Sequence, residues 1–312
     1  MQHRKEGRGG IAALVASVIL LVIAVAALAL HLSPFSPSSA VSTPTHSSSA
    51  PESPRPFACA ASSPPVVNGE PAARWRSVAA YDAASKRVLM FGGETTTGFL
   101  DDTWTWNGTS WLRWTLSARP TPRSHPAMAY DAPRQEVVLY GGQDRHLSVP
   151  GMPYLHDTWL WNGCSWRRAN PALSPVVSDA VMTFDARSGE IVLFGLIAGG
   201  PVTAETWTWN GITWSKRENV NNPPGRVGAS MAYDPGTKRV LLFGGFNNSA
   251  GSLNDTWAWD GTRWTQLQPS SSPSARDQAA MAAEMASGHI VLFGGNSGGV
   301  LDSDTWIWLG SD

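Results

Sequence analysis

The sequence predicts an all-β protein folded as a five-bladed β-propeller of four-stranded antiparallel blades. Three observations predict it. A five-residue phrase ending in Trp-x-Trp occurs five times, starting at Asp102, Asp157, Glu205, Asp255 and Asp304. The intervals are 55, 48, 50 and 49 residues, and a period near 50 residues is typical of radial repeats. Four strand signals accompany each phrase, which predicts repeats at about 74–122, 123–176, 177–225, 226–275 and 276–312.

The second repeat illustrates the strand signals. An apolar run at 126–130 is followed by a second at 137–140, which ends at Gly141-Gly142. Alternation then places Trp159 and Trp161 on one face of a third strand. Asn162-Gly163 predicts a type I′ hairpin into a fourth strand at Trp166, because that turn requires positive φ at both central residues. The same dipeptide, or Asp-Gly, recurs at 107–108, 210–211 and 260–261.

The innermost predicted strands are rich in alanine, as expected where five strands converge on a narrow axis. Fourteen of the sixteen tryptophans occupy repeat positions, and Trp75 and Trp114 do not. A large aromatic at every repeat is best explained by burial in the core.

Three further phrases, Phe91-Gly92-Gly93, Phe243-Gly244-Gly245 and Phe293-Gly294-Gly295, each precede an Asp-Thr-Trp-x-Trp phrase. In this combination the chain resembles kelch repeats of the galactose-oxidase-like superfamily, over about residues 74–312. The resemblance implies a propeller, and such propellers serve as protein-binding platforms and, in a few cases, as enzyme scaffolds. The fold does not choose between these.

The last repeat reaches only its third strand, at Trp308, before Asp312. An open propeller edge exposes unpaired backbone groups. We therefore expect residues 57–67, which precede the first repeat, to supply the outermost strand of the last blade. Pro64 and Pro65 are compatible with an edge strand.

The N-terminal region predicts export. Residues 11–31 form an uncharged, largely apolar segment long enough to span a bilayer, and Arg4, Lys5 and Arg8 precede it. The positive-inside rule then places residues 1–10 in the cytoplasm and the propeller outside, on a single-pass signal anchor. A cleaved signal peptide with Ala27-Leu28-Ala29 at its end is the alternative, giving a secreted protein. Residues 32–56 are rich in Ser, Pro and Thr, which predicts a disordered stalk.

The charge and cysteine content limit the kinds of partner and cofactor that the sequence predicts. Lys and Arg number 23 against 24 Asp and Glu, so no basic surface is predicted for nucleic acid. Cys59 and Cys164 are expected on blades far apart in the ring, which favours two isolated thiols, although export permits a disulfide. No zinc-binding spacing is present, and no cofactor is predicted.

Comparison among the repeats separates structural residues from candidate functional ones. Arg74, Arg123, Arg226 and Arg276 share one position, and we expect them to bind carbonyls or the repeat aspartate. The next positions differ between repeats and enter the innermost strands at one mouth of the channel. Variable loops on a rigid scaffold usually carry function, and the longest, 143–156, opens on this face. The candidate ligand-binding residues are therefore Trp75, Arg76, His125, Asp179, Asp277 and Gln278, with Arg145, His146, Tyr154 and His156 in the long loop.

Two functions remain open. The first is a membrane-anchored module that binds a protein or a carbohydrate, with no catalytic residues. The second is an exported kelch-type enzyme acting on a sugar, an isomerase or hydrolase using Arg76, His125 and Asp179, or a carboxylate pair of Asp179 and Asp277. A copper site is disfavoured because most tyrosines sit at repeat positions.

Overall fold

The computed structural model describes residues 2–4, 66–144, 154–197, 203–218, 220–284 and 286–310. The predicted membrane segment, the predicted stalk, residues 57–65, Arg145 and His146 lie outside these ranges. Among the described residues, no helix has the length and apolar character needed to cross a bilayer.

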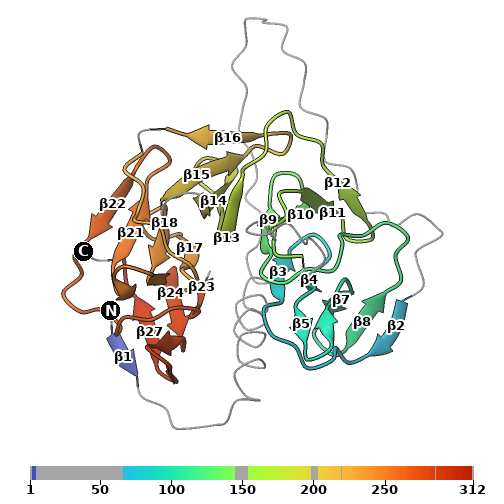
Figure 1. The fold of residues 1–312 in the computed structure, drawn as a ribbon, viewed down its shortest axis with the longest axis horizontal. Helices are drawn as coiled ribbons and strands as arrows, with labels where there is room; N and C mark the ends of the chain where they lie inside the picture. Colours follow the sequence, from blue (N-terminus) through green and yellow to red (C-terminus); the bar gives the residue numbers. More distant parts are fainter. Residues whose placement is uncertain are drawn as a thin grey trace, which may run out of the picture.

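The structure is a five-bladed all-β propeller with four-stranded blades, as the repeats predict (Figure 1). Blades one and two contain β3 (Val78–Asp82), β4 (Arg87–Phe91), β7 (Thr103–Trp106), β8 (Trp111–Trp114) and β9 (Ala127–Asp131), β10 (Glu136–Tyr140), β11 (Thr158–Trp161), β12 (Trp166–Arg168). Blades three and four contain β13 (Val177–Asp185), β14 (Glu190–Ile197), β15 (Ala204–Trp209), β16 (Trp214–Arg217) and β17 (Ser230–Asp234), β18 (Arg239–Phe243), β21 (Thr256–Trp259), β22 (Trp264–Leu267). Blade five contains β23 (Ala280–Glu284), β24 (His289–Phe293) and β27 (Thr305–Trp308), with β1 (Gln2–Arg4) at its outer edge.

Three short hairpins lie between the second and third strands of blades one, four and five. They are β5 (Glu94–Thr95) with β6 (Gly98–Phe99), β19 (Phe246–Asn247) with β20 (Gly251–Ser252), and β25 (Asn296–Ser297) with β26 (Val300–Leu301). They occupy the loops that the sequence predicts to open at the channel mouth.

The core lies between the blades. The second strand of each blade is flanked on both sides, and the central residues of β10, such as Val138 and Leu139, are fully buried. The Trp-x-Trp strand pairs with it, Leu139 opposite Trp159 and Val137 opposite Trp161. Fully buried tryptophans include Trp161, Trp209, Trp214, Trp259, Trp264 and Trp308. The core role expected for the repeat tryptophans therefore holds for these residues.

The Asn-Gly turns differ from the type I′ prediction. Gly108 has φ of 99°, but Asn107 keeps a negative φ, as do Asn162, Asn210 and Asp260. The loop has four residues, because Trp106 pairs with Trp111. Asn107 Oδ1 accepts hydrogen bonds of 2.9 Å from the amides of Thr109 and Ser110. The side chain thus caps the turn by a local Asx interaction, and only the glycine supplies the left-handed conformation.

The repeat arginines bind the repeat aspartates, as expected. Arg123 is completely buried and donates to Asp157 Oδ1 at 2.7 Å and to the Gly141 carbonyl at 2.9 Å. In three other blades the repeat arginine makes the same two contacts, one with a glycine carbonyl and one with the aspartate. The arginine–aspartate pairs are Arg74 with Asp102, Arg226 with Asp255 and Arg276 with Asp304. Burial alone would raise the pKa of these aspartates, but the arginine hydrogen bonds and charge outweigh it and lower the pKa below its usual range.

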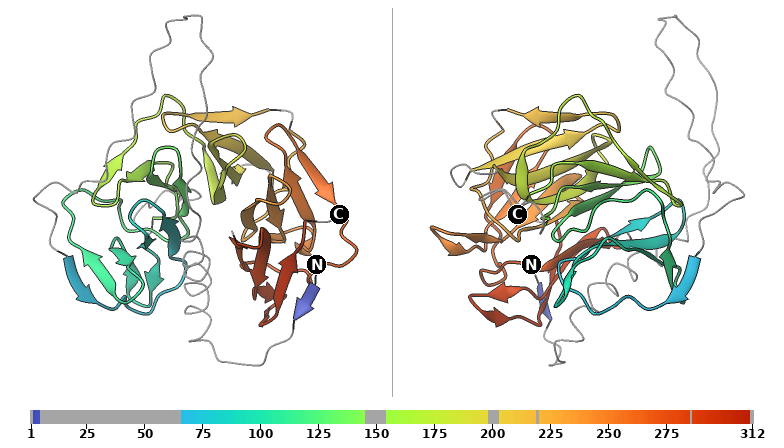
Figure 2. Two further views of the ribbon diagram at one scale, coloured as in Figure 1. Left: turned by 180° about the vertical axis from the view of Figure 1, so that it is seen from behind. Right: turned by 45° about the vertical axis from the view of Figure 1, so that its right-hand side comes forward.

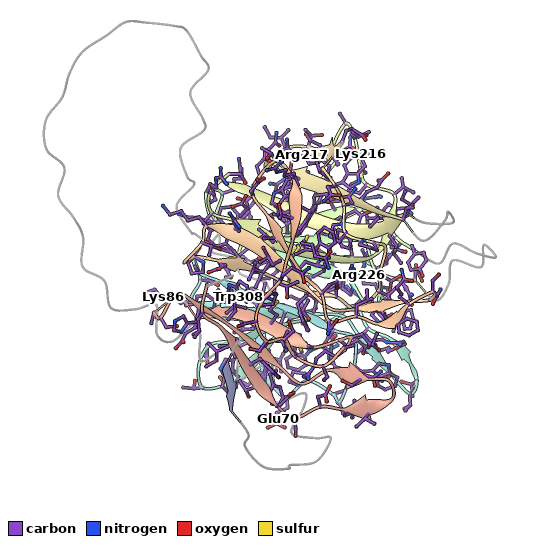
Figure 3. All side chains as sticks on the ribbon, turned by 90° about the vertical axis from the view of Figure 1, so that its left-hand side faces the viewer. Glu70, Lys86, Lys216, Arg217, Arg226 and Trp308 are labelled. Atoms are coloured by element: carbon purple, nitrogen blue, oxygen red, sulfur yellow. The ribbon has the colours of Figure 1, made fainter. Side chains whose placement is uncertain are left out.

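Blade three lacks this arginine, and a lysine on its outer strand takes over the contact with the acidic residue. Val177 holds the position, and Glu205 replaces the aspartate. Lys216 on the outer strand β16 contacts Glu205 at 2.7 Å. Figure 3 shows Lys216 and Arg217 at the rim, whereas Arg226 lies within the blades. The acidic partner is therefore compensated by a half-exposed lysine from the outer strand.

The structure corrects the predicted closure of the last blade. Residues 66 and 67, the described end of the predicted closing segment, belong to β2 (Val66–Gly69). β2 pairs with β8 as a fifth strand of blade one. The fourth position of blade five is filled instead by β1, with His3 opposite Trp306. β2 leads directly into β3 of blade one, so pairing with β8 keeps it on the blade that follows it in sequence.

The expectation of isolated thiols is wrong for Cys164, which is disulfide-bonded. The chain contains one other cysteine, Cys59. The expectation failed because it rested on placing the segment around Cys59 at blade five. β2, which begins seven residues after Cys59, instead lies on blade one, beside the blade that carries Cys164.

We expect the unreduced protein, unfolded in denaturant, to show no reaction of its cysteines with a maleimide. After reduction, both cysteines should react, with a mass increase of two adducts. Intact-mass spectrometry checks this, and Cys164→Ser provides the control, with one adduct expected before reduction. Two adducts on unreduced wild-type protein would contradict the disulfide.

A candidate ligand site at the channel mouth

The innermost strands β3, β9, β13, β17 and β23 lie around the centre of the molecule (Figures 1 and 2). One residue at the entry to each of these strands has a left-handed backbone, two positions before the strand in four blades and at the bulge within β13 in blade three. These residues are Arg76, His125, Asp179, Gly228 and Gln278, with φ of 57°, 50°, 47°, 62° and 56°. The four that are not glycine are all among the predicted ligand-binding residues.

Glycine fits this backbone position without strain, as Gly228 demonstrates in blade four. A side chain at such a φ costs on the order of 1 kcal/mol or more. Four blades nevertheless carry Arg, His, Asp or Gln, four different polar side chains. Arg76 and Gln278 are exposed, and His125 and Asp179 are half-buried. Packing against the core therefore does not determine which side chain stands at this position. This is the property expected of ligand-binding positions.

Arg76 and His125 form the first part of a charged cluster. Arg76 Nη1 contacts Glu94 Oε1 at 2.7 Å, and the arginine side chain remains 44% exposed. Burial lowers the pKa of His125, and the charge of Arg76 lowers it further. The carboxylates of Asp179 and Glu94 act in the opposite direction without restoring the usual value. His125 is therefore favoured in its neutral form, with one ring nitrogen able to accept a hydrogen bond.

Tyr154 and Asp179 form the second part. Burial raises the pKa of Tyr154, and the negative charge of Asp179 raises it further. The tyrosine side chain is hydrogen-bonded to the side chains of Gln143, Ser178 and Asp179. Since Asp179 also acts on His125, the two parts are continuous across blades one, two and three. The cluster contains an arginine, two carboxylates, an imidazole and a phenol.

The histidine environments lead to a testable result. We expect His125 and His156 to titrate below the ordinary histidine pKa of about 6.5, because burial disfavours the charged imidazolium in both. Histidine-selective NMR across pH 4–8 measures this, with His125→Asn to assign the signal. A midpoint above about 6.5 for His125 would contradict the described charge balance. Since the folded pKa is lowered, the stability contribution of neutral His125 is present above pH 6.5 and is lost as the pH falls below it.

Apolar and aromatic side chains are also exposed on the mouth face. Trp75 is 46% exposed, and its backbone pairs with Glu94. Phe246 on blade four is 37% exposed and pairs with Val227 in the same way. Val300 and Leu301 on β26 are also exposed. The face therefore joins a charged sector on blades one to three with aromatic and aliphatic side chains beside it.

The other predicted residues are placed differently. Asp277 is buried, its pKa is raised by that burial, and its side chain accepts a hydrogen bond from Asn296. Asp179 lies in β13 of blade three and Asp277 precedes β23 of blade five, so blade four separates this predicted carboxylate pair. His156 lies 3.4 Å from the Tyr140 hydroxyl, beside Asp157, with different neighbours from Tyr154. In the described part of the chain, no three His, Cys, Asp or Glu side chains gather as a metal site.

Sequence reasoning missed Glu94, Gln143 and Ser178 as members of the site. The available signal was their repeat position. Glu94, Gln143, Phe246 and Asn296 each follow the Gly-Gly pair or its equivalent, and each pairs with the residue after the repeat arginine. This position varies between repeats as much as the predicted ones do.

Comparison with known proteins supports the fold alone. No family model and no curated protein matches the sequence. Among solved structures, the chain is similar to one described as the structure of YjhT, with a TM-score of 0.55 and 14% identity. The match covers 74% of this chain and 80% of that chain. At this identity the likeness concerns the propeller architecture and not the function.

Proposed function

We propose that the chain is a kelch-type propeller that binds a protein or carbohydrate ligand at the channel mouth. The main support for this proposal is a cluster of polar side chains at positions that differ between blades. The cluster consists of Arg76, Glu94, His125, Tyr154 and Asp179. Exposed aromatics beside it supply flat apolar surface. Aromatic faces next to hydrogen-bonding groups suit sugars and polar peptide surfaces equally.

The proposal includes export and anchoring through residues 11–31. The Cys164 disulfide supports an oxidising compartment, because disulfides persist mainly outside the cytosol. A chain that crosses a membrane through this segment places Gln2–Arg4 opposite the propeller. The proposal therefore requires that Gln2–Arg4 leave β27 in the anchored protein. Protease added to intact cells should release a propeller-sized fragment, and a protein found wholly inside the cell would contradict the proposal.

A second candidate is an enzyme acting on a sugar. His125 with its lowered pKa and Tyr154 beside Asp179 favour it, because both can exchange protons with a bound polyol. The test is isomerisation or hydrolysis of sugars followed by NMR, comparing wild type with His125→Asn. Turnover lost in that variant would favour the enzyme, and binding without turnover would favour the module.

The test of the binding function is a screen of full-length protein against a glycan array and a panel of surface proteins. Hits should weaken at least tenfold in Asp179→Asn or Arg76→Ala, since each removes one charged partner of a ligand. Thr109→Ala and Thr262→Ala, in the hairpins at the opposite end, serve as controls and should leave affinity unchanged. A ligand that responds to the hairpin variants and not to the mouth variants would refute the proposal.

A further inference from the structure

The join between blades five and one differs from the other four joins. The innermost strands pack in succession, β3 on β9, β9 on β13, β13 on β17 and β17 on β23. Within the described residues, β23 and β3 have no comparable packing. Blades five and one also stand apart in Figures 1 and 2. The ring is therefore continuous through four joins and loose at the fifth.

The first three joins share one side-chain arrangement. The first tryptophan of the outer strand in each blade packs against the previous blade. Its indole N–H donates to the threonine that begins the Trp-x-Trp strand there, as in Trp166 to Thr103 at 3.0 Å, Trp214 to Thr158 at 2.9 Å and Trp264 to Thr206 at 2.8 Å. The same indoles meet Phe91, Tyr140 and Phe194 at 5.6–6.0 Å between ring centroids. We call this arrangement the tryptophan latch.

Blade five carries the receiving half of the latch at the loose join. Thr305 and Phe293 occupy the positions of Thr158 and Tyr140. One face of blade five consists of Ala280, Ala282, Val291, Phe293, Thr305 and Ile307, which lie opposite one another across the three strands. All six are half-buried, whereas the six matching residues of blade two, Ala127, Ala129, Val138, Tyr140, Thr158 and Leu160, are buried.

Blade one carries the donating half. Trp111 occupies the position of Trp166, opposite the last residue of its Trp-x-Trp strand. Its ring contacts Trp106 of its own blade at 5.6 Å between centroids. It makes no hydrogen bond to Thr305 in the structure and is only half-buried. The residues of a fourth tryptophan latch, Trp111 on blade one and Thr305 and Phe293 on blade five, are thus present, but Trp111 makes no hydrogen bond or ring contact with the other two in the structure.

The mouth ring repeats the same pattern in its backbone. The His125 amide donates to the Arg76 carbonyl at 3.0 Å between blades two and one. The Gln278 amide donates to the Gly228 carbonyl at 2.7 Å between blades five and four. At the loose join the equivalent bond would run from the Arg76 amide to the Gln278 carbonyl. Packing of blade one on blade five would form it and place Gln278 beside the charged cluster.

We propose that this join opens and closes, and that it closes when Trp111 latches onto Thr305 and Phe293 of blade five. Closure covers the half-exposed apolar face, which is favourable because apolar surface leaves water. The proposal does not depend on the identity of any ligand.

The experiment is cysteine cross-linking in the full chain. Arg76→Cys with Gln278→Cys probes the loose join, and peptide mass spectrometry quantifies the product of a short bis-maleimide. Arg76→Cys with His125→Cys, across a tight join, sets the maximum yield. His125→Cys with Gln278→Cys, on blades that are not neighbours, sets the background. We expect the loose-join pair to approach the maximum. A yield equal to background, with the tight-join pair reacting, would overturn the proposal.

The latch itself is tested by adding Trp111→Ala. The yield of the loose-join pair should fall on the order of tenfold, from loss of one hydrogen bond and one aromatic contact. Thr109→Ala, in the hairpin next to Trp111, should leave it unchanged. The tight-join pair in the Trp111→Ala background monitors folding. If that pair still reacts and the loose-join yield is also unchanged, Trp111 is not the latch.

Discussion

Replacement of Trp214 by alanine should lower the free energy of unfolding by about 3–5 kcal/mol. Trp214 is 1% exposed, donates to Thr158 and packs against Tyr140 and Trp209. The substitution removes a large buried surface, leaves a cavity between two blades and deletes a hydrogen bond. Urea unfolding monitored by circular dichroism measures the change.

Two variants separate these contributions. Trp214→Phe keeps an aromatic ring but loses the indole donor, so its cost should be smaller than that of alanine. Trp75→Ala removes a tryptophan that is 46% exposed and should change stability by within about 0.5 kcal/mol. If Trp75→Ala and Trp214→Ala destabilise equally, the division into core and mouth tryptophans is wrong.

Replacement of Arg123 by alanine should cost about 3–5 kcal/mol, because it leaves Asp157 largely buried without its partner. The Arg123 side chain is 0% exposed and binds the carboxylate through two nitrogens. The control is Arg167→Ala, whose side chain is 56% exposed in its pair with Glu136 and should cost less than about 1 kcal/mol. Denaturant unfolding at pH 7 gives both values.

The Arg123 effect should depend on pH. The folded pKa of Asp157 is lowered, so the pair stabilises the fold above the unfolded aspartate pKa of about 3.9. That contribution is lost as the pH falls through the lowered folded pKa. The difference between wild type and Arg123→Ala should therefore shrink in acid. A difference that is constant from pH 7 to pH 3 would show that lost packing, and not the ion pair, carries the effect.

The repeats made the fold and the arginine network predictable, because each blade supplies an independent copy of the same contacts. Val177 was recognisable as an exception, and the structure supplies its compensation in Lys216. The channel-mouth positions of Arg76, His125, Asp179 and Gln278 were also found by comparing repeats. Their left-handed backbone was not predicted, although Gly228 in the same column was the available sign.

Features outside the repeats could not be predicted in this way. The segment around Cys59 has no second copy to compare, so its pairing depended on a guess about which edge is free. The type I′ prediction failed because the dipeptide does not reveal loop length, and Asn107 uses its side chain to cap a four-residue turn. Glu94 was overlooked because the comparison used only the positions that follow the repeat arginine, although Glu94 also occupies a repeat position, paired with Trp75.

Backbone hydrogen–deuterium exchange with and without the ligand from the binding screen tests the central claim most directly. If the channel mouth carries the ligand, exchange should slow at residues 75–77, 94–96, 124–126 and 178–180. The opposite hairpins, at 107–111, 162–166, 210–214 and 260–264, should be unaffected. Slowed exchange confined to those hairpins, with no change at the mouth, would contradict the account.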